Sequence, residues 1–385
     1  MTMANLSQRN TTKLVVWSLL VAYVFLSGIS LALRGRNRNL ESEENLSNLS
    51  NLRNLASKEN VRPTYDMSCP LAMIEYIHVG QQIPEAARYS VQSGAQSVIT
   101  EALESDALTD RKIIMIGDSN MRQVFSSLSC IAHTAGFWKD DNAYTAGTMP
   151  GYYPGMYYDA RLNLKGGLGE VFYSPTAGNI QNYGWTRDTP LQGNEDWLQN
   201  CRDRKPFYLD TYTYDAPNVG QTYSENDDRF EKVLLGGKDV VFINAGLHLN
   251  ARDQNMVHLL ELVDCMKAFK HDGEDPGWPQ IFYVRSNQQH FNNADEGGAF
   301  PISRNGPTTC LESVDIEKNS FFRQDKATFQ GKLPMVGFDL DLGGVGKLHI
   351  GMGGRLDCSH WAMPGVPDAY AREIAAAILT IGLED

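Results

Sequence analysis

Two short motifs near opposite ends of the chain contain the residue types used in nucleophilic acyl transfer. Gly117-Asp-Ser119 directly follows an apolar run, and Asp357-Cys-Ser-His360 lies just before the last amphipathic stretch. A histidine can take the proton of a serine hydroxyl, and a carboxylate three residues away can fix the tautomer of that histidine. The alternative is that His360 is an ordinary histidine that packs beside Trp361. Whether His360 is catalytic or only packs in the core depends on whether the fold brings the two motifs together.

Those elements follow from an alternation of apolar runs and helical stretches. Continuous apolar strands separated by helices predict a parallel sheet with both faces covered, which is a three-layer α/β/α fold. A turn would then present Ser119 at the carboxyl edge of the sheet, where a helix begins and its unpaired backbone N–H groups can stabilise an oxyanion. Residues 136–235 are rich in Gly, Tyr and Asn and are expected to be an insertion near the substrate site. The expected strands are 112–117, 238–244 and 281–285, and the expected helices are 121–135, 255–271 and 367–383.

The composition excludes several classes of protein. Of the 385 residues, 42% are hydrophobic and 21% are charged, which excludes wholesale disorder and collagen-like repeats. Asp and Glu outnumber Lys and Arg by 46 to 34, and the excess lies beyond residue 62 because the first 62 residues are net basic. An acidic body argues against binding to nucleic-acid backbones. The sequence contains neither a metal-binding motif nor a phosphate-binding loop, so no metal and no bound cofactor is expected.

Residues 14–33 form an uncharged apolar run that is long enough to cross a bilayer as one helix. The run is longer than the apolar core of a typical signal peptide, which favours a retained anchor over cleavage near Ala32. We therefore divide the chain into a short tail at 1–13, a transmembrane anchor at 14–33, a low-complexity stem at 34–62 and a body at 63–385.

Charges and cysteines indicate opposite orientations for this anchor. Basic residues are more numerous after the apolar run than before it, which weakly favours a cytosolic body. All six cysteines lie in the body, and an even number favours disulfides and therefore an oxidising lumen. Asn45 and Asn48 are in glycosylation motifs, but the tail contains two more such motifs on the other side of the run. We favour a lumenal body, with six buried thiols in a cytosolic domain as the alternative.

Three sequence blocks extend the two motifs into a longer pattern. They are Gly-Asp-Ser-Asn-Met-Arg-Gln-Val-Phe-Ser-Ser-Leu-Ser-Cys at 117–130, Phe-Tyr-Val-Arg-Ser-Asn-Gln-Gln-His-Phe at 282–291, and Asp-Cys-Ser-His-Trp-Ala-Met-Pro-Gly-Val-Pro-Asp at 357–368. The first and last blocks resemble the SGNH hydrolase superfamily, and all three in this order resemble its trichome-birefringence-like and PC-esterase families. Two departures mark a divergent member: Ala362 stands where plant members usually have a cysteine, and Asn287-Gln288 replaces Ser-Pro.

The resemblance implies roles for the residues of both motifs. Ser119 would be the nucleophile, His360 its general base and Asp357 the carboxylate that orients His360. Asp118 is expected to order the turn, and a structural role is favoured for His290.

Other residues are candidates for binding the oxyanion or the substrate. Asn244-Ala-Gly-Leu-His248 takes the place of the superfamily's Gly-x-Asn-Asp block. Gly246 would let the chain approach the substrate, and Asn244 or His248 would hydrogen-bond an oxyanion, with a plain loop as the alternative. Arg122 and Arg285 would bind an anionic donor or, as we favour, pair with carboxylates at the surface.

The function implied by the resemblance is O-acetylation of a polysaccharide or glycan through an acyl-serine intermediate. The protein would be a single-pass type II protein of the Golgi membrane, with its catalytic domain in the lumen. Acetyl-CoA or another acetyl donor would be a co-substrate, and the partner would be a polysaccharide or glycan acceptor. The runner-up is a carbohydrate esterase that removes acetyl groups with the same triad. A non-catalytic glycan-binding protein is less favoured because all three triad residues are present.

Overall fold

A computed structural model describes residue 69 and residues 84–138, 160–165, 168–175, 195–212, 230–247, 249–271, 276–299, 310–352 and 355–381. The expected tail at 1–13, anchor at 14–33 and stem at 34–62 lie outside the described residues. Among the residues that are described, no helix is both long and apolar enough to span a membrane.

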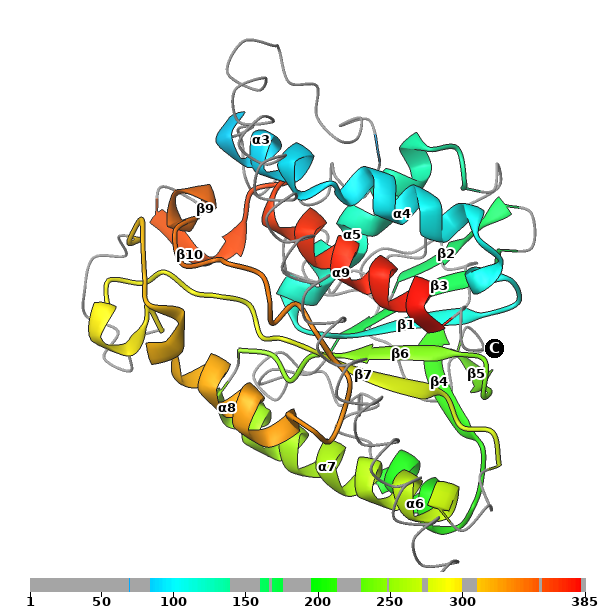
Figure 1. Ribbon diagram of the computed structural model, residues 1–385. Helices are drawn as coiled ribbons and strands as arrows, with labels where there is room; N and C mark the ends of the chain where they lie inside the picture. Colours follow the sequence, from blue (N-terminus) through cyan, green and yellow to red (C-terminus); the bar gives the residue numbers. More distant parts are fainter. Residues whose placement is uncertain are drawn as a thin grey trace, which may run out of the picture. The chain divides into compact units, whose positions relative to one another are not determined.

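A six-stranded sheet in the order β2-β3-β1-β6-β7-β8 forms the centre of the described body (Figure 1). All neighbouring strands are parallel except β2, which is antiparallel to β3 at one edge. The strands are β1 (Lys112–Gly117), β2 (Ala160–Asn163), β3 (Glu170–Pro175), β6 (Val240–Ile243), β7 (Gln280–Val284) and β8 (Met335–Val336).

Helices flank both faces of this sheet (Figure 1). One group, drawn above the sheet, comprises α3 (Pro84–Ser93), α4 (Ala95–Glu104), α5 (Ser119–Thr134) and α9 (Val366–Ile381). The other comprises α6 (Glu195–Arg202), α7 (Leu249–His271) and α8 (Ser320–Phe329). Alternate side chains of a strand point to opposite faces, so β1 contributes to two cores: Ile113 and Met115 pack on one side, and Ile114 and Ile116 on the other. The expected mostly parallel sheet with flanking helices is confirmed.

The expected strands at 112–117, 238–244 and 281–285 correspond to β1, β6 and β7, and the expected helices correspond to α5, α7 and α9. The stretch 136–235 differs from the expectation. It contributes β3, which pairs with β1 in parallel inside the sheet, so this stretch is not only an insertion.

Two hairpins lie outside the main sheet. They are β4 (Phe207–Tyr212) with β5 (Phe230–Leu235), and β9 (His349–Met352) with β10 (Arg355–Trp361). Strand β10 carries the Asp357-x-x-His360 motif, and its register with β9 shifts between Asp357 and Trp361. The motif therefore lies on an irregular strand that turns its residues out of the regular alternation.

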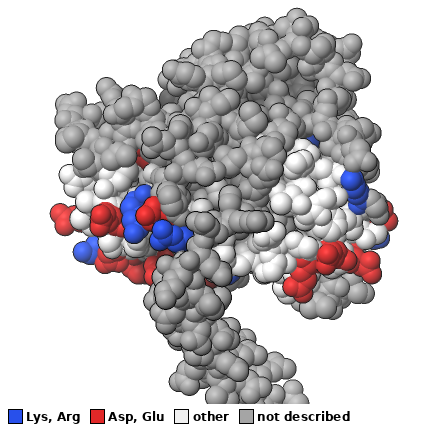
Figure 2. All heavy atoms as spheres, turned by 90° about the horizontal axis from the view of Figure 1, so that it is seen from above, with Lys and Arg blue, Asp and Glu red and all other residues white. Residues whose placement is uncertain are grey.

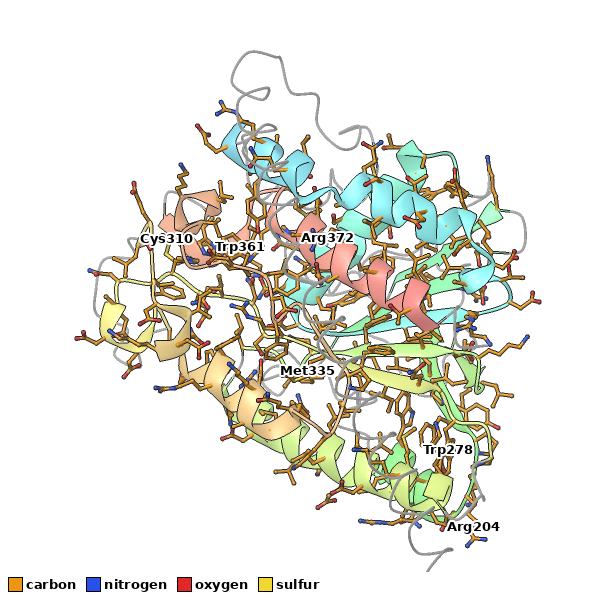
Figure 3. The ribbon with its side chains drawn as sticks, in the orientation of Figure 1. Arg204, Trp278, Cys310, Met335, Trp361 and Arg372 are labelled. Atoms are coloured by element: carbon orange, nitrogen blue, oxygen red, sulfur yellow. A yellow bond between two sulfur atoms is a disulfide. The ribbon has the colours of Figure 1, made fainter. Side chains whose placement is uncertain are left out.

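All six cysteines form disulfides, as the sequence predicts. The pairs are Cys69–Cys130, Cys201–Cys265 and Cys310–Cys358. Figure 3 shows Cys310 and Trp361 beside the β9–β10 hairpin, whereas Trp278 and Arg204 lie near one end of α7.

Charged side chains of both signs lie on the face shown in Figure 2. Acidic and basic side chains lie beside one another at one side of this view, and several acidic side chains lie together at the opposite side. The described part of this face therefore has no extended basic area.

Candidate active site

The turn from β1 into α5 presents Ser119. A Cβ atom on Gly117 would lie 2.4 Å from Met121 Cβ, so only glycine lets the strand lead this closely into the helix. Asp118 caps α5, because its Oδ1 accepts a hydrogen bond from the Asn120 N–H at 3.0 Å. Ser119 lies at the carboxyl end of β1, as the sequence predicts, and it is the first residue of α5, two residues before the expected start of that helix.

Ser119, His360 and Asp357 form a continuous hydrogen-bonded series. Ser119 Oγ lies 2.6 Å from His360 Nε2, and His360 Nδ1 lies 2.6 Å from Asp357 Oδ2. The second carboxylate oxygen, Oδ1, accepts from the backbone N–H of Ser359 at 2.8 Å and of His360 at 3.1 Å. The side chains of His360 and Asp357 are 24% and 17% exposed, so the site is shielded yet open to solvent. The structure thus brings the three predicted triad residues together.

Asp357 and His360 stabilise each other's charged forms. Burial raises the pKa of Asp357, but the charge and hydrogen bonds of His360 outweigh burial and hold this pKa well below its usual range. Burial lowers the pKa of His360, but the charge and hydrogen bond of Asp357 outweigh that effect and raise the pKa. Arg122 opposes this rise and Asp118 adds to it. Asp357 is therefore ionised, and His360 binds a proton more readily than a free histidine, which suits a general base.

The loop after β6 is fixed beside the nucleophile turn. Asp118 Oδ2 accepts a hydrogen bond from the Leu247 N–H at 2.9 Å. Asn244 Oδ1 accepts from the Gly246 N–H at 2.6 Å, and Asn244 Nδ2 donates to the Val284 carbonyl at 3.0 Å. The N–H of Gly246 is thus engaged within the loop, and Gly246 has a φ of 79°, which favours glycine. These contacts make Asn244 and Gly246 loop-shaping residues. The oxyanion contact of Asn244 and the approach of substrate at Gly246 stay predictions.

The third candidate of this loop, His248, lies outside the described residues. Its place relative to Ser119 therefore stays a prediction of the sequence.

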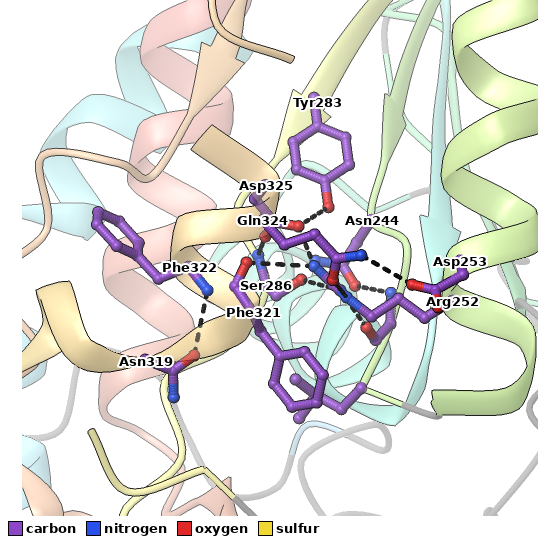
Figure 4. Close-up of polar contacts among 12 residues, drawn as sticks. Asn244, Arg252, Asp253, Tyr283, Ser286, Asn319, Phe321, Phe322, Gln324 and Asp325 are labelled. Carbon is purple, nitrogen blue, oxygen red and sulfur yellow. Dashed lines mark hydrogen bonds and ion pairs between the residues drawn. The ribbon is translucent and has the colours of Figure 1, made fainter. Parts of the chain in front are cut away.

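A buried ion pair lies behind this loop (Figure 4). Arg252 of α7 and Asp325 of α8 are both fully buried and contact each other. Arg252 also donates to the Gly246 carbonyl at 2.5 Å and to Ser286 Oγ at 2.7 Å. Asp325 accepts from the Tyr283 hydroxyl at 2.6 Å and from the Ser286 N–H at 2.8 Å. One charge pair therefore joins two helices, the end of β7 and the loop that follows β6. Neither residue lies in one of the sequence motifs or blocks described above.

Sequence comparison relates most of the chain to a plant protein. The chain is similar to protein trichome birefringence-like 42 of Arabidopsis thaliana. The two are 23% identical over 292 residues, which are 70% of this chain and 71% of the plant protein. No protein-family model matches the chain. This distant match supports a relationship with the trichome birefringence-like family, which the sequence blocks predict.

Two arginines of the sequence blocks at 117–130 and 282–291 are buried rather than at the surface. Arg122 is 4% exposed, and its charge lowers the pKa of His360, so it lies within electrostatic reach of the site. Arg285 is 1% exposed, donates to the Leu340 carbonyl at 2.9 Å and lies 4.6 Å from the ring centroid of Phe322. The expectation of surface ion pairs is therefore wrong for both arginines. A role of Arg122 in binding substrate stays a prediction.

Side-chain amides, which sequence analysis did not single out, hold both neighbours of the triad histidine. Gln123 of α5 donates to the Trp361 carbonyl at 2.8 Å and accepts from the Trp361 N–H at 3.1 Å. Gln289 Nε2 donates to Ser359 Oγ at 2.9 Å. Asn287 contacts both the Ser359 carbonyl and the Trp361 indole. The available signal in the sequence was the departure from the trichome birefringence-like pattern at Asn287.

A pair of histidines supports the backbone of β10. His349 Nδ1 lies 2.8 Å from the His360 carbonyl oxygen, and His349 Nε2 lies 2.8 Å from His290 Nδ1. Burial lowers the pKa of His349 to about 3 and that of His290 to about 4, so both rings are neutral at pH 7. A carbonyl oxygen only accepts hydrogen bonds, so His349 carries its proton on Nδ1 and accepts at Nε2 from His290. Within the described ranges, no group of three or more His, Cys, Asp or Glu is arranged to hold a metal ion.

Proposed function

We propose that this protein is a polysaccharide or glycan O-acetyltransferase that works through an acyl-Ser119 intermediate. The observation that carries the proposal is the series from Ser119 Oγ through His360 to Asp357, with 2.6 Å at each step. A serine, a histidine and an ionised carboxylate in this order can transfer acyl groups. The similarity to trichome birefringence-like 42 supports the assignment of acetyl transfer to a polysaccharide, which the resemblance of the three sequence blocks implies.

In the first half-reaction, His360 Nε2 takes the proton of Ser119 while Ser119 Oγ attacks the carbonyl carbon of the acetyl donor. The oxyanion forms near the N-terminus of α5, where the helix dipole favours negative charge. The bond to the leaving group then breaks, and His360 gives its proton to that group. Acetyl-CoA, as the donor, would leave as the free thiol of coenzyme A. The donor is a co-substrate, and the proposal includes no resident cofactor.

In the second half-reaction, His360 deprotonates a sugar hydroxyl, whose oxygen attacks the acetyl carbonyl carbon on Ser119. The Ser119 ester bond breaks, and Ser119 recovers its proton from His360, so the products are the acetylated sugar and free enzyme. Water in place of the sugar would release acetate. The protein would then be a carbohydrate esterase, which is the second candidate because the triad serves both reactions.

The proposed fold class is the three-layer SGNH type. The mostly parallel sheet, its flanking helices and the position of Ser119 at the end of β1 support it. We further propose that residues 14–33 anchor the chain in the Golgi membrane as a single-pass type II protein. Three disulfides support a lumenal body, because such bonds persist in oxidising compartments.

The test compares the full-length protein with its Ser119→Ala variant. Each is incubated with isotopically labelled acetyl-CoA or 4-nitrophenyl acetate and with a panel of oligosaccharides, and mass spectrometry follows the label on protein, sugar and free acetate. We expect label on Ser119 that moves to one class of sugar, and no transfer by the alanine variant.

The other outcomes point to the other functions. Label that reaches only water, whichever sugar is offered, would make the protein an esterase. A folded protein that binds sugars but never carries label on Ser119 would contradict the acyl-serine mechanism and favour a glycan-binding role.

A further inference from the structure

We propose that Asn287 is a positioning residue that sets the alignment of Ser119 with His360. The proposal rests on the proposed function, because alignment matters only where Ser119 is the nucleophile. Ser119 begins α5 and His360 lies in β10, so the two reacting side chains come from separate elements. Asn287 follows β7 and lies at the junction of those elements.

The side chain of Asn287 uses both ends of its amide at this junction. Its Nδ2 donates to Asn120 Oδ1 at 2.9 Å and to the Ser359 carbonyl at 2.5 Å. Its Oδ1 accepts a hydrogen bond from the Trp361 indole N–H. Asn120 follows the nucleophile in sequence, while Ser359 and Trp361 flank the triad histidine. One side chain therefore connects the residue next to the nucleophile with both residues next to the base.

Asn287 is 6% exposed, so its hydrogen bonds are largely shielded from exchange with water. A cavity of about 20 Å³ lies against Asn287 and is also lined by Asn120, Met121, Trp361 and Tyr370. The Trp361 ring stacks on His349, with 3.7 Å between the ring centroids, so packing holds one side of this junction. On the side of the cavity, the hydrogen bonds of Asn287 connect the two segments.

Other contacts also hold β10 at this junction, and they do not depend on Asn287. Gln123 of α5 forms two hydrogen bonds with the Trp361 backbone, and the Cys310–Cys358 disulfide holds β10 from the other side. A variant at Asn287 should therefore fold, because these contacts and those of Gln289 and His349 still hold β10. Loss of Asn287 contacts should then change alignment more than it changes global stability.

The expected effect is on the rate at which Ser119 reacts. A misplacement of about 1 Å can lower the rate of a reaction about 10²-fold. We therefore expect Asn287→Ala to lower the reactivity of Ser119 about 10- to 100-fold. Because Asn287 is neutral, the pH of half-maximal reactivity should stay at its wild-type value while the maximal rate falls.

The experiment measures labelling of the full-length protein by a fluorophosphonate. Ser119 Oγ displaces fluoride from phosphorus and passes its proton to His360, so neither a sugar nor an acetyl donor is needed. Labelling rates are recorded against pH for the wild type, Ser119→Ala and Asn287→Ala. Asn287→Ser, which keeps a shorter hydrogen-bonding group, should react at a rate between those of the wild type and Asn287→Ala. If the alanine variant does not fold, Asn287→Ser provides the test in its place.

Asn319→Ala is the matched control. Asn319 is 1% exposed, donates to the Gly297 carbonyl at 3.2 Å and caps α8 by accepting from the Phe322 N–H at 3.1 Å. Its loss removes a buried amide of the same size outside the junction. We expect Asn319→Ala to lower the thermal midpoint and to leave the labelling rate within about twofold of the wild type.

Three results would count against the proposal, and they differ from one another. Equal labelling rates in the wild type and Asn287→Ala would overturn the positioning role and leave the proposed function intact. An equal loss of labelling rate in Asn319→Ala would show that the loss in Asn287→Ala comes from lower stability. That result would also overturn the positioning role. Absence of labelling in folded wild-type protein would overturn the proposed function together with this inference.

Discussion

At the scale of single residues, the chemistry of the site depends on mutual charge stabilisation between Asp357 and His360. Asp357 uses both carboxylate oxygens, one for the ring of His360 and one for two backbone N–H groups. The charge and ring hydrogen bond of His360, followed by the two backbone contacts, hold the carboxylate ionised, and the ionised carboxylate in turn raises the pKa of His360. Nucleophile activation needs neutral His360, so the rate must rise with pH as His360 loses its proton.

Asp357→Asn should lower the maximal rate and move the acid limb of the pH profile to lower pH. In the wild type this limb lies above 6.5, the ordinary pKa of histidine, because Asp357 raises the pKa of His360. Asparagine removes the charge that causes the rise. It also stabilises neither the imidazolium nor the correct tautomer, so we expect the rate to fall about 10⁴-fold. The measurement is the fluorophosphonate labelling rate of Ser119, recorded from about pH 5 to about pH 9.

The control for this prediction is Asp315→Asn. Asp315 is a cap at the start of a short helical turn, where it accepts from the Glu317 N–H at 3.1 Å. Its removal should leave the profile unchanged. An acid limb that stays in place in Asp357→Asn would contradict the assigned cause of the pKa shift.

At the scale of elements, the important constraint is on β10, which carries both Asp357 and His360. Cys358 lies between them and is bonded to Cys310 across a separation of 48 residues. Gln123, Asn287 and the histidine pair hold the same strand by hydrogen bonds. The strand is thus fixed from several directions at the place where its register with β9 shifts.

Removing the disulfide of β10 should therefore reduce both stability and rate. For a loop of 48 residues, the double variant Cys310→Ser with Cys358→Ser should lose about 4 kcal/mol of unfolding free energy, on a chain-entropy argument. The labelling rate of the folded protein should also fall, by about 10-fold, because β10 gains freedom beside Ser119. Denaturant unfolding and labelling measure the two effects separately.

The second disulfide provides a matched comparison. Cys201–Cys265 joins α6 to α7 and closes a loop of 64 residues, so its double serine variant should also lose about 4 kcal/mol. Its labelling rate should stay at the wild-type value because neither helix carries a triad residue. Equal rate losses in both double variants would show that the disulfide of β10 has no special role in the site.

At the scale of the whole molecule, the described body has two apolar cores, one on each side of the sheet. The Arg252–Asp325 pair lies at the side of α7 and α8 and reaches the Gly246 carbonyl beside the nucleophile turn. Breaking one partner of a buried pair leaves the other charge buried without compensation. The stability of this side of the molecule and the shape of the site are therefore linked.

Asp325→Ala should lower the unfolding free energy by about 3–5 kcal/mol, because Arg252 would remain buried and unpaired. The comparison is Glu261→Gln, which removes the partner of Arg202 in a pair whose side chains are 52% and 57% exposed. That change should cost less than about 1 kcal/mol. Denaturant unfolding measures the loss of unfolding free energy in each variant. A similarly small loss in both would contradict the prediction that the buried pair stabilises the fold.

The strongest local patterns were sufficient to predict much of the fold. The buried run Lys112–Gly117 and the helix that follows it were predictable, the latter to within two residues of its start, because apolar periodicity and a glycine turn act between neighbouring residues. Strand β3, Glu170–Pro175, was missed because it ends at a proline and lies in a stretch rich in Gly, Tyr and Asn, where no long apolar run marks a strand. Its pairing with β1, a partner far away in the sequence, makes it a strand.

The sequence by itself determined the chemical types at the site: a serine after a strand, and an aspartate and a histidine three residues apart. Only the tertiary structure decided that Ser119 and His360, 241 residues apart, lie in hydrogen-bonding contact. It also decided that Arg122 and Arg285 are buried and that Asn287 joins the two triad segments. The physical reason is range. Backbone periodicity and turn chemistry depend on adjacent residues, whereas burial, pKa shifts and the alignment of α5 with β10 depend on how distant segments pack together.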